Sequence, residues 1–238
     1  MTVMIDGRRD IGLAAVERVA WAGEPVALAP AAMARMRHSR DGFMRLLDDP
    51  DIVVYGVTSG YGQMAHVRLS GEQRRRHAQQ PPHANRVTFG EVFPERVTRA
   101  ILVARLANYV DGHAAITPEL AAAVAAMSRD EALPPVPMEG HGGAGEILIL
   151  GELFGPLAET HPLREKDTLA LINGSPAAAA LVADAALVAR RRLAVIEEVF
   201  ALAYDAFQAP VEHIDSALTE LWNDDAEAAA VRSLAGLL

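Results

Sequence analysis

Three glycine-marked segments hold the residues whose types and spacing could carry chemistry. They span residues 55–62, 140–146 and 169–174, and read Tyr-Gly-Val-Thr-Ser-Gly-Tyr-Gly, Gly-His-Gly-Gly-Ala-Gly-Glu and Leu-Ala-Leu-Ile-Asn-Gly. Because glycine adopts positive φ and lets a ligand approach the backbone closely, such segments suit both tight turns and loops that face a substrate. Each segment taken singly is more often only a turn.

Several familiar chemistries do not fit these segments. Residues 140–145 match the glycine pattern of a dinucleotide site, but that motif follows a strand, and the prolines at 134, 135 and 137 argue against one. No Gly-x-Ser-x-Gly elbow and no cysteine occur, so serine and cysteine nucleophiles are not supported. The eight histidines lack metal-ligand spacing, and we expect no metal and no cofactor. They are His38, His66, His77, His83, His113, His141, His161 and His213.

Composition favours a soluble globular protein. The chain has 238 residues, 51% of them hydrophobic, and a formal charge of -9, with no basic run longer than three arginines. We therefore expect no nucleic-acid partner. The first six residues lack the pattern of a secretion signal, which favours a cytoplasmic location. The apolar stretch 169–189 contains Asn173, Pro176 and Asp184, so we expect a buried helix and no membrane span.

Hydrophobic periodicity predicts a mainly α protein with short strands and glycine-rich loops. Helices are expected over 11–20 and 30–47, and a third from Pro94 at the N1 position to Gly112. A fourth helix is expected to start at residues 117–119, where threonine can cap it and proline fits the first turn. Residues 166–206 read as one long helix or two abutting ones, broken near 173–176. The β-branched run 52–55 leads into the first glycine loop. Three prolines and four glycines between 133 and 145 predict no regular element there.

In this order and spacing, the motifs resemble the aromatic amino acid lyases, the histidine and phenylalanine ammonia-lyase type. Residues 54–62, continued by 65–68, are similar to the family's V-Y-G-V-N-T-G-F-G and A-x-V-R, and 166–174 to its K-E-G-L-A-L-I-N-G. Residues 134–140 resemble P-V-V-P-E-K-G, and Arg105 and Gly112 have the family's separation. The resemblance implies a lyase-like bundle of long helices over a single domain, 1–238. Its active-site region would be 1–165, and the central bundle would start in 166–238.

The resemblance also implies roles for three side chains. Tyr55 corresponds to the family's catalytic base on a loop over the active site, Asn173 to the asparagine beside the electrophile, and His83 to a histidine near the substrate. Simpler interpretations remain open. They are a half-buried strand aromatic for Tyr55, a helix cap for Asn173 and a loop residue for His83.

One departure from the family concerns its electrophile. In the family, an Ala-Ser-Gly tripeptide cyclises and dehydrates to a methylidene-imidazolone, but here the serine position falls on Ala144 or Gly145, and neither has a hydroxyl to lose. We therefore expect a lyase or isomerase that is not an ordinary ammonia-lyase. Tyr55, whose free pKa is about 10, would need neighbouring donors or cations to move a proton next to a substrate carbonyl. Elimination, isomerisation or conjugate addition would then be accessible. The backbone at Gly62, Gly142, Gly143, Ala144 and Gly145 would bind the small-molecule substrate and its developing enolate.

A second departure concerns length, since family enzymes are about twice this size and form tetramers whose active sites use several subunits. The resemblance thus implies a heteromeric complex with a second chain that supplies the carboxy-terminal half, or otherwise a homo-oligomer. Two rival hypotheses stay open: a non-catalytic scaffold subunit that completes a partner's active site, and a small-molecule binding module. The altered loop suggests a specialised pathway such as secondary metabolism.

Overall fold

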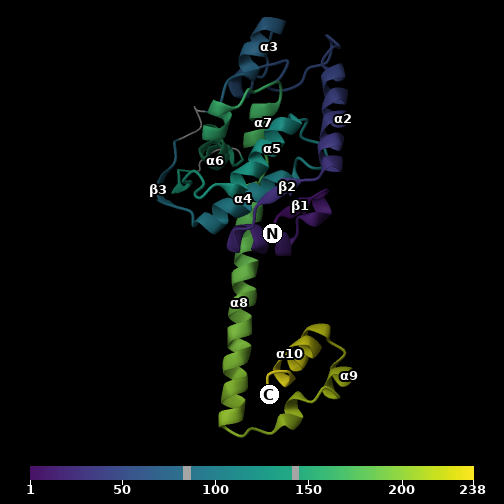
Figure 1. The fold of residues 1–238 in the computed structure, drawn as a ribbon, viewed down its shortest axis with the longest axis vertical. Helices are drawn as coiled ribbons and strands as arrows, with labels where there is room; N and C mark the ends of the chain where they lie inside the picture. The colour runs from purple at the N-terminus through teal and green to yellow at the C-terminus, as the bar shows by residue number, and fades with distance from the viewer. Residues whose placement is uncertain (83–86, 141–144) are drawn as a thin grey trace. The chain divides into compact units, whose positions relative to one another are not determined.

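The computed structural model describes residues 1–82, 87–140 and 145–238, and it is mainly helical, as predicted (Figure 1). The chain divides into two compact units, Met1–Asp184 and Ala185–Leu238. The long helix α8 (Pro176–Ala206) contributes to both units.

The first unit opens with a small parallel ribbon. Strand β1 (Val3–Ile5) pairs with β2 (Val26–Leu28), and between them α1 (Leu13–Val16) continues into a π-helical turn, Glu17–Trp21. This turn completes the helix predicted over 11–20. Helix α2 (Pro30–Leu46) follows, with proline in its first turn as the sequence predicts.

Two predicted helix ends need correction. Helix α4 (Glu95–Ala107) begins after Pro94, which is the N-cap and not the first helical residue. It ends at Ala107, five residues before Gly112. Gly112 itself has φ +84°, and a Cβ there would lie 2.8 Å from Cβ of Ser39. Helix α5 (Pro118–Ala126) begins as expected after Thr117, but the threonine hydroxyl does not cap it.

The core of the first unit lies where α4, α5, α6 (Ile147–Thr160) and α7 (Asp167–Ile172) meet, as the centre of the upper part of Figure 1 shows. Helix α5 contacts β2, α2, α4 and α6. The largest fully buried side chains are aliphatic and aromatic, as expected for helices that are apolar on more than one face. They include Ile101, Leu102, Leu106, Tyr109, Leu120, Leu150, Leu153, Phe154 and Leu171.

A second ribbon contradicts the prediction that 133–145 holds no regular element. Strand β3 (Phe89–Val92) pairs antiparallel with β4 (Pro137–Glu139), in the register Phe89 to Glu139 and Val92 to Pro137. The prolines are compatible with it because Pro137 is the first residue of the strand, where a missing N–H disturbs the ladder least. Helix α3 (Gly71–Ala78) precedes this ribbon and starts with a capping box between Ser70 and Gln73.

The predicted break between two abutting helices is confirmed. Helix α7 ends at Ile172 and α8 starts at Pro176. Together they form Asp167–Ala206, the one segment in the described part of the chain that could cross a membrane by length and composition. Its most apolar window has a mean hydropathy of 1.5 and is 39% buried. A core helix of a soluble protein passes the same test, so the finding alone favours neither a membrane span nor a core helix.

The second unit contains the end of α8 with α9 (Leu218–Trp222) and α10 (Asp225–Ala235). Asp224 caps α10 through its carboxylate, and the Ser233 hydroxyl donates to Glu197 of α8 at 2.7 Å. Large apolar side chains of α8 nevertheless stay exposed in this unit. They are Leu193, Val195, Ile196, Val199, Phe200 and Leu202.

Candidate active site

Tyr55 lies in a folded loop and not in a strand. Its phenolic oxygen accepts a hydrogen bond of 2.9 Å from the backbone N–H of Gly62, and its side chain is otherwise half exposed. The loop is closed by Thr58, whose N–H donates to the carbonyl of Val54 and whose hydroxyl oxygen accepts from the N–H of Val54 at 2.8 Å. Gly62 has φ +58°, a conformation that glycine adopts at little cost.

The same loop is fastened to α7 through Gly56. This residue has φ +67°, and a Cβ built on it would lie 2.5 Å from Cδ1 of Leu169. Leu169 also belongs to a small apolar cluster with Val57 and Leu47. The tight packing of Gly56 on Leu169 therefore sets where the Tyr55 loop lies against the start of α7.

Asn173 follows the other end of α7. It is exposed and occupies the C-cap position, where its side-chain Nδ2 donates to the carbonyl of Leu169 at 2.9 Å. Its own carbonyl accepts from the buried guanidinium of Arg105. The geometry thus gives Asn173 a capping contact, one of the two interpretations left open by the sequence.

Arg105 holds the α7 end in place. Its guanidinium donates to the carbonyl of Leu171 at 3.2 Å and to the side chain of Asn108 at 2.8 Å, and it lies 5.3 Å from the ring centre of Tyr109. The Tyr109 hydroxyl in turn donates to Ala170 at 3.0 Å. Burial raises the pKa of Tyr109, although Arg105 opposes the shift, so the hydroxyl keeps its proton and remains a donor.

The described end of the glycine-rich loop is tied to α8 by Glu146. Its two carboxylate oxygens accept from the N–H groups of Ala177 and Ala178, at 2.6 and 2.7 Å. A carboxylate at this position satisfies two free donors of the helix and interacts favourably with its dipole. Gly145 beside it has φ +69° and open space around its Cα.

The predicted site residues are therefore joined in two groups. In the first group, Tyr55 contacts Gly62 directly. In the second group, Arg105 holds Asn173, and Glu146, the neighbour of Gly145, holds the start of α8. Helix α7 links the two groups, because Gly56 packs on its Leu169 and Asn173 follows its end. Within the described residues, no hydrogen bond joins Tyr55 to Asn173. His83, Gly142, Gly143 and Ala144 lie outside the described residues, so their predicted roles stay predictions.

From the sequence alone, Glu146 has no predicted role. Arg105 was singled out only because its separation from Gly112 matches that of the family. Glu146 and its partner Ala177 are 31 residues apart, and no local pattern links a carboxylate after a glycine loop to that helix start. The one feature of the sequence that could have indicated this contact is that α8 has no acidic residue of its own in its first turn.

In the described ranges, no group of three or more His, Asp or Glu side chains could hold a metal ion.

The site thus combines long helices, a tyrosine loop fastened to α7 and a capped start of α8. Residues 11–161 match the family model for aromatic amino acid lyases. The chain belongs to the aromatic amino acid lyase family, and resembles its amino-terminal half.

Individual relatives agree with this assignment. The chain is 31% identical to a histidine ammonia-lyase of Gloeobacter violaceus, over 68% of this chain and 36% of that protein. A histidine ammonia-lyase of Geobacillus thermodenitrificans is 28% identical over 87% of this chain and 46% of its own length. Among solved structures, tyrosine aminomutase from Streptomyces globisporus has a TM-score of 0.81 at 24% identity, covering 98% of this chain and 49% of its own. The chain thus spans about half the length of its relatives or less.

Proposed function

We propose that this chain is a subunit of a lyase-type enzyme that works without a methylidene-imidazolone. The observation that carries the proposal is that residues 143–145 read Gly-Ala-Gly, where the family has Ala-Ser-Gly. The serine position falls on Ala144 or Gly145, and neither has a hydroxyl to eliminate, so the usual electron sink has no precursor in this loop. The reaction would then be an elimination, isomerisation or conjugate addition, including cyclisation, on a substrate whose own carbonyl acidifies the α-proton.

Tyr55 is the group that would transfer the proton. A general acid or base must reach the substrate, and its half-exposed side chain on a loop meets that requirement. The N–H of Gly62 already donates to the phenolic oxygen and supplies one of the donors that this chemistry needs. His83 or a residue of another chain would supply a further donor.

The glycine-rich loop would bind the negative charge that develops on the substrate carbonyl. Backbone amides at Gly142, Gly143, Ala144 and Gly145 are the candidate donors, and Asn173 would contribute its amide. The fixation of Glu146 on α8 supports this assignment, because an oxyanion site must be held rigidly before the charge develops.

Further chains would complete the site. In the second unit, the exposed apolar side chains between Leu193 and Leu202 support burial of α8 against other helices. We propose that a second chain supplies the carboxy-terminal half, with a homo-oligomer as the other possibility. We also propose that the enzyme is cytoplasmic and belongs to a specialised pathway. Native mass determination, with and without the product of an adjacent gene, distinguishes the two assemblies.

The intact mass of the purified chain tests the missing electrophile. We expect the mass calculated from the sequence, 25.4 kDa, with no loss of water. Loss of two waters localised to residues 142–145 would contradict the proposal, because formation of the electrophile removes one water on cyclisation and a second on side-chain dehydration. In the active complex, Tyr55→Phe should then abolish deuterium exchange at the substrate α-carbon, whereas Tyr61→Phe in the same loop should preserve it.

A non-catalytic scaffold is the second candidate, and the C-cap contact of Asn173 favours it. A scaffold needs the asparagine only to end α7, so Asn173→Ser would leave turnover in the complex unchanged, as would Tyr55→Phe. Loss of turnover in a folded Tyr55→Phe complex would exclude it.

A further inference from the structure

Lys166 is the single lysine of a chain that has 21 arginines, and its backbone is unusual. It stands directly before α7 with φ +77°, in the left-handed region that a residue with a Cβ seldom adopts. Such strain persists where the surrounding structure requires it, and it is common at ligand-binding positions. The backbone of Lys166 is therefore typical of a ligand-binding position.

Among the described residues, the ammonium group of Lys166 has no counterion. The side chain is partly buried, and burial lowers its pKa. No ion pair or hydrogen bond joins it to another residue in the described ranges. Because removal of a charge from water is costly without a partner, an anion is the group that this position lacks.

Two further unpaired cations line the same cavity. Arg74 from α3 and Arg164 from the turn before α7 make no side-chain hydrogen bond or ion pair with a described residue, and Nε of Arg74 is buried without an acceptor. The imidazole of His77 also lines the cavity, and Glu165 is the one carboxylate among the described residues that line it. Three cations against one carboxylate is a local excess of positive charge in a chain of net charge -9.

We propose that this cavity, bounded by α3 and by the turn at 164–166, binds a small oxyanion, a carboxylate or a phosphate group. The open space is about 20 Å³, which accommodates one water-sized group, so a single anionic oxygen fits inside it. Lysine and arginine donors are the usual partners of such oxygens.

The site would also connect the Tyr55 loop to its surroundings. Gly56 and Tyr61 line the cavity, and the Tyr61 ring lies 4.9 Å from the ring of His77. An anion bound there would join this loop to α3 and to the start of α7 through shared contacts. The inference does not depend on the reaction proposed above, since it concerns binding alone.

Amine labelling gives a direct test, because Lys166 and the amino terminus are the only amines in the chain. The intact protein is acetylated with an activated ester in sodium phosphate, sodium acetate or sodium chloride at equal ionic strength, and each site is quantified by peptide mass spectrometry. We expect phosphate or acetate to slow labelling of Lys166 severalfold, while Met1 labels at the same rate in all three salts. Equal rates at Lys166 in all three salts would overturn the proposal.

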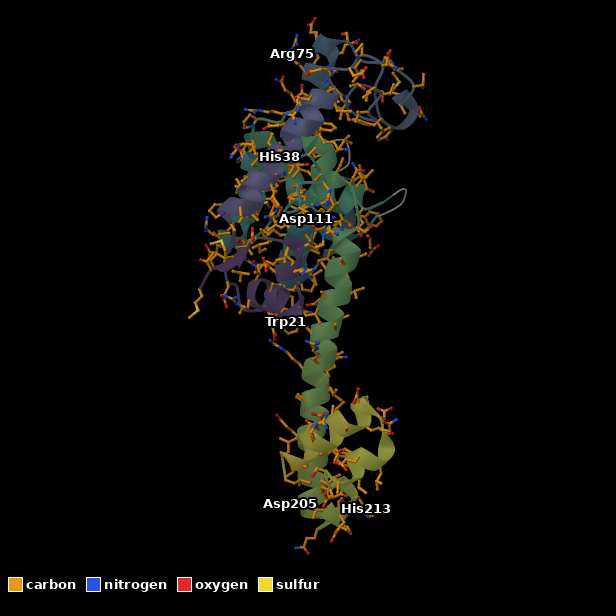
Figure 2. The ribbon with its side chains drawn as sticks, turned by 90° about the vertical axis from the view of Figure 1, so that its right-hand side faces the viewer. Trp21, His38, Arg75, Asp111, Asp205 and His213 are labelled. Carbon is orange, nitrogen blue, oxygen red and sulfur yellow. The ribbon has the colours of Figure 1, made fainter. Side chains whose placement is uncertain are left out.

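Thermal unfolding of variants tests the same anion site. Lys166→Gly should melt no lower than the wild type in chloride, since glycine relieves the left-handed backbone, and should lose the stabilisation by phosphate or acetate. Arg74→Gln should lose most of that stabilisation. Arg75→Gln, on the same helix at an exposed position outside the cavity (Figure 2), should retain it. An equal loss in Arg75→Gln would indicate general charge screening and overturn the site.

The two oxyanions distinguish the sources of the ligand. A response to phosphate alone supports a phosphate-bearing ligand, and a response to acetate alone supports a carboxylate such as that of a substrate. If neither anion acts and Lys166 is protected only in a complex with another chain, the counterion is a protein carboxylate and the proposal is wrong.

Discussion

The phenolic oxygen of Tyr55 and the backbone N–H of Gly62, seven residues apart, are joined by a hydrogen bond of 2.9 Å. The contact closes the loop on itself, so Tyr55 is oriented by its own segment. A substitution at Gly62 that disfavours a positive φ would therefore displace the tyrosine. The effect would come from the backbone alone, because Gly62 has φ +58° and nothing lies within 4 Å of its missing Cβ.

Gly62→Ala should lower the free energy of unfolding by about 1 kcal/mol, the cost of left-handed backbone in a residue with a Cβ. Urea unfolding measures this loss. Gly145→Ala is a matched control, since Gly145 also has positive φ and open space but no contact with Tyr55. Both variants should lose similar stability, yet only Gly62→Ala should speed amide exchange in residues 56–62. Faster exchange there in both variants would contradict the orienting role of Gly62.

At Gly56 the same substitution should cost more. Its Cβ would add a 2.5 Å approach to Leu169 to the strain of φ +67°, so Gly56→Ala should lose about 3 kcal/mol of stability, by overpacking together with backbone strain. A double-mutant cycle checks the cause. Leu169→Ala removes the clashing atoms, so the double variant should be more stable than the sum of the two losses predicts. Strict additivity would locate the whole cost in the backbone.

The two glycines differ in what the sequence alone could predict. A glycine-marked loop at 56–62 was evident from composition, and Pro30 and Pro176 marked two helix starts that the structure bears out. The contact of Gly56 with Leu169 was not predictable, because it joins segments more than a hundred residues apart. The β3–β4 ribbon was missed since prolines usually exclude strands, and only the pairing shows that Pro137 stands at a strand end.

Arg105 should be the most sensitive position of the α7 end. Arg105→Met leaves the buried carbonyl of Leu171 and the side chain of Asn108 without their donor, so stability should fall by about 3 kcal/mol. Arg37→Met is the control, because the Arg37–Glu119 pair is exposed on both sides and should cost no more than about 0.5 kcal/mol. Urea unfolding of both variants checks the difference. Equal small losses would show that Arg105 does not hold the turn.

Lys166 gives a prediction with a definite pH window. Burial lowers its pKa below the ordinary 10.5, so the native state releases this proton more readily than the unfolded chain does. The penalty for the buried charge is fully present below the folded pKa, and it disappears as pH rises through that value to 10.5. The wild type should therefore gain stability relative to Lys166→Gln as pH rises from neutral towards 10.5.

Urea unfolding of both proteins across this range measures the difference, and the lone lysine makes the comparison clean because no other lysine titrates. The measurement should be made in chloride and repeated in phosphate. An oxyanion bound beside the ammonium stabilises its charged form, so phosphate should flatten the pH dependence. A stability difference that stays constant from neutral pH to 10.5 in chloride would show that the ammonium is not desolvated. It would also remove the reason why this position needs an anion.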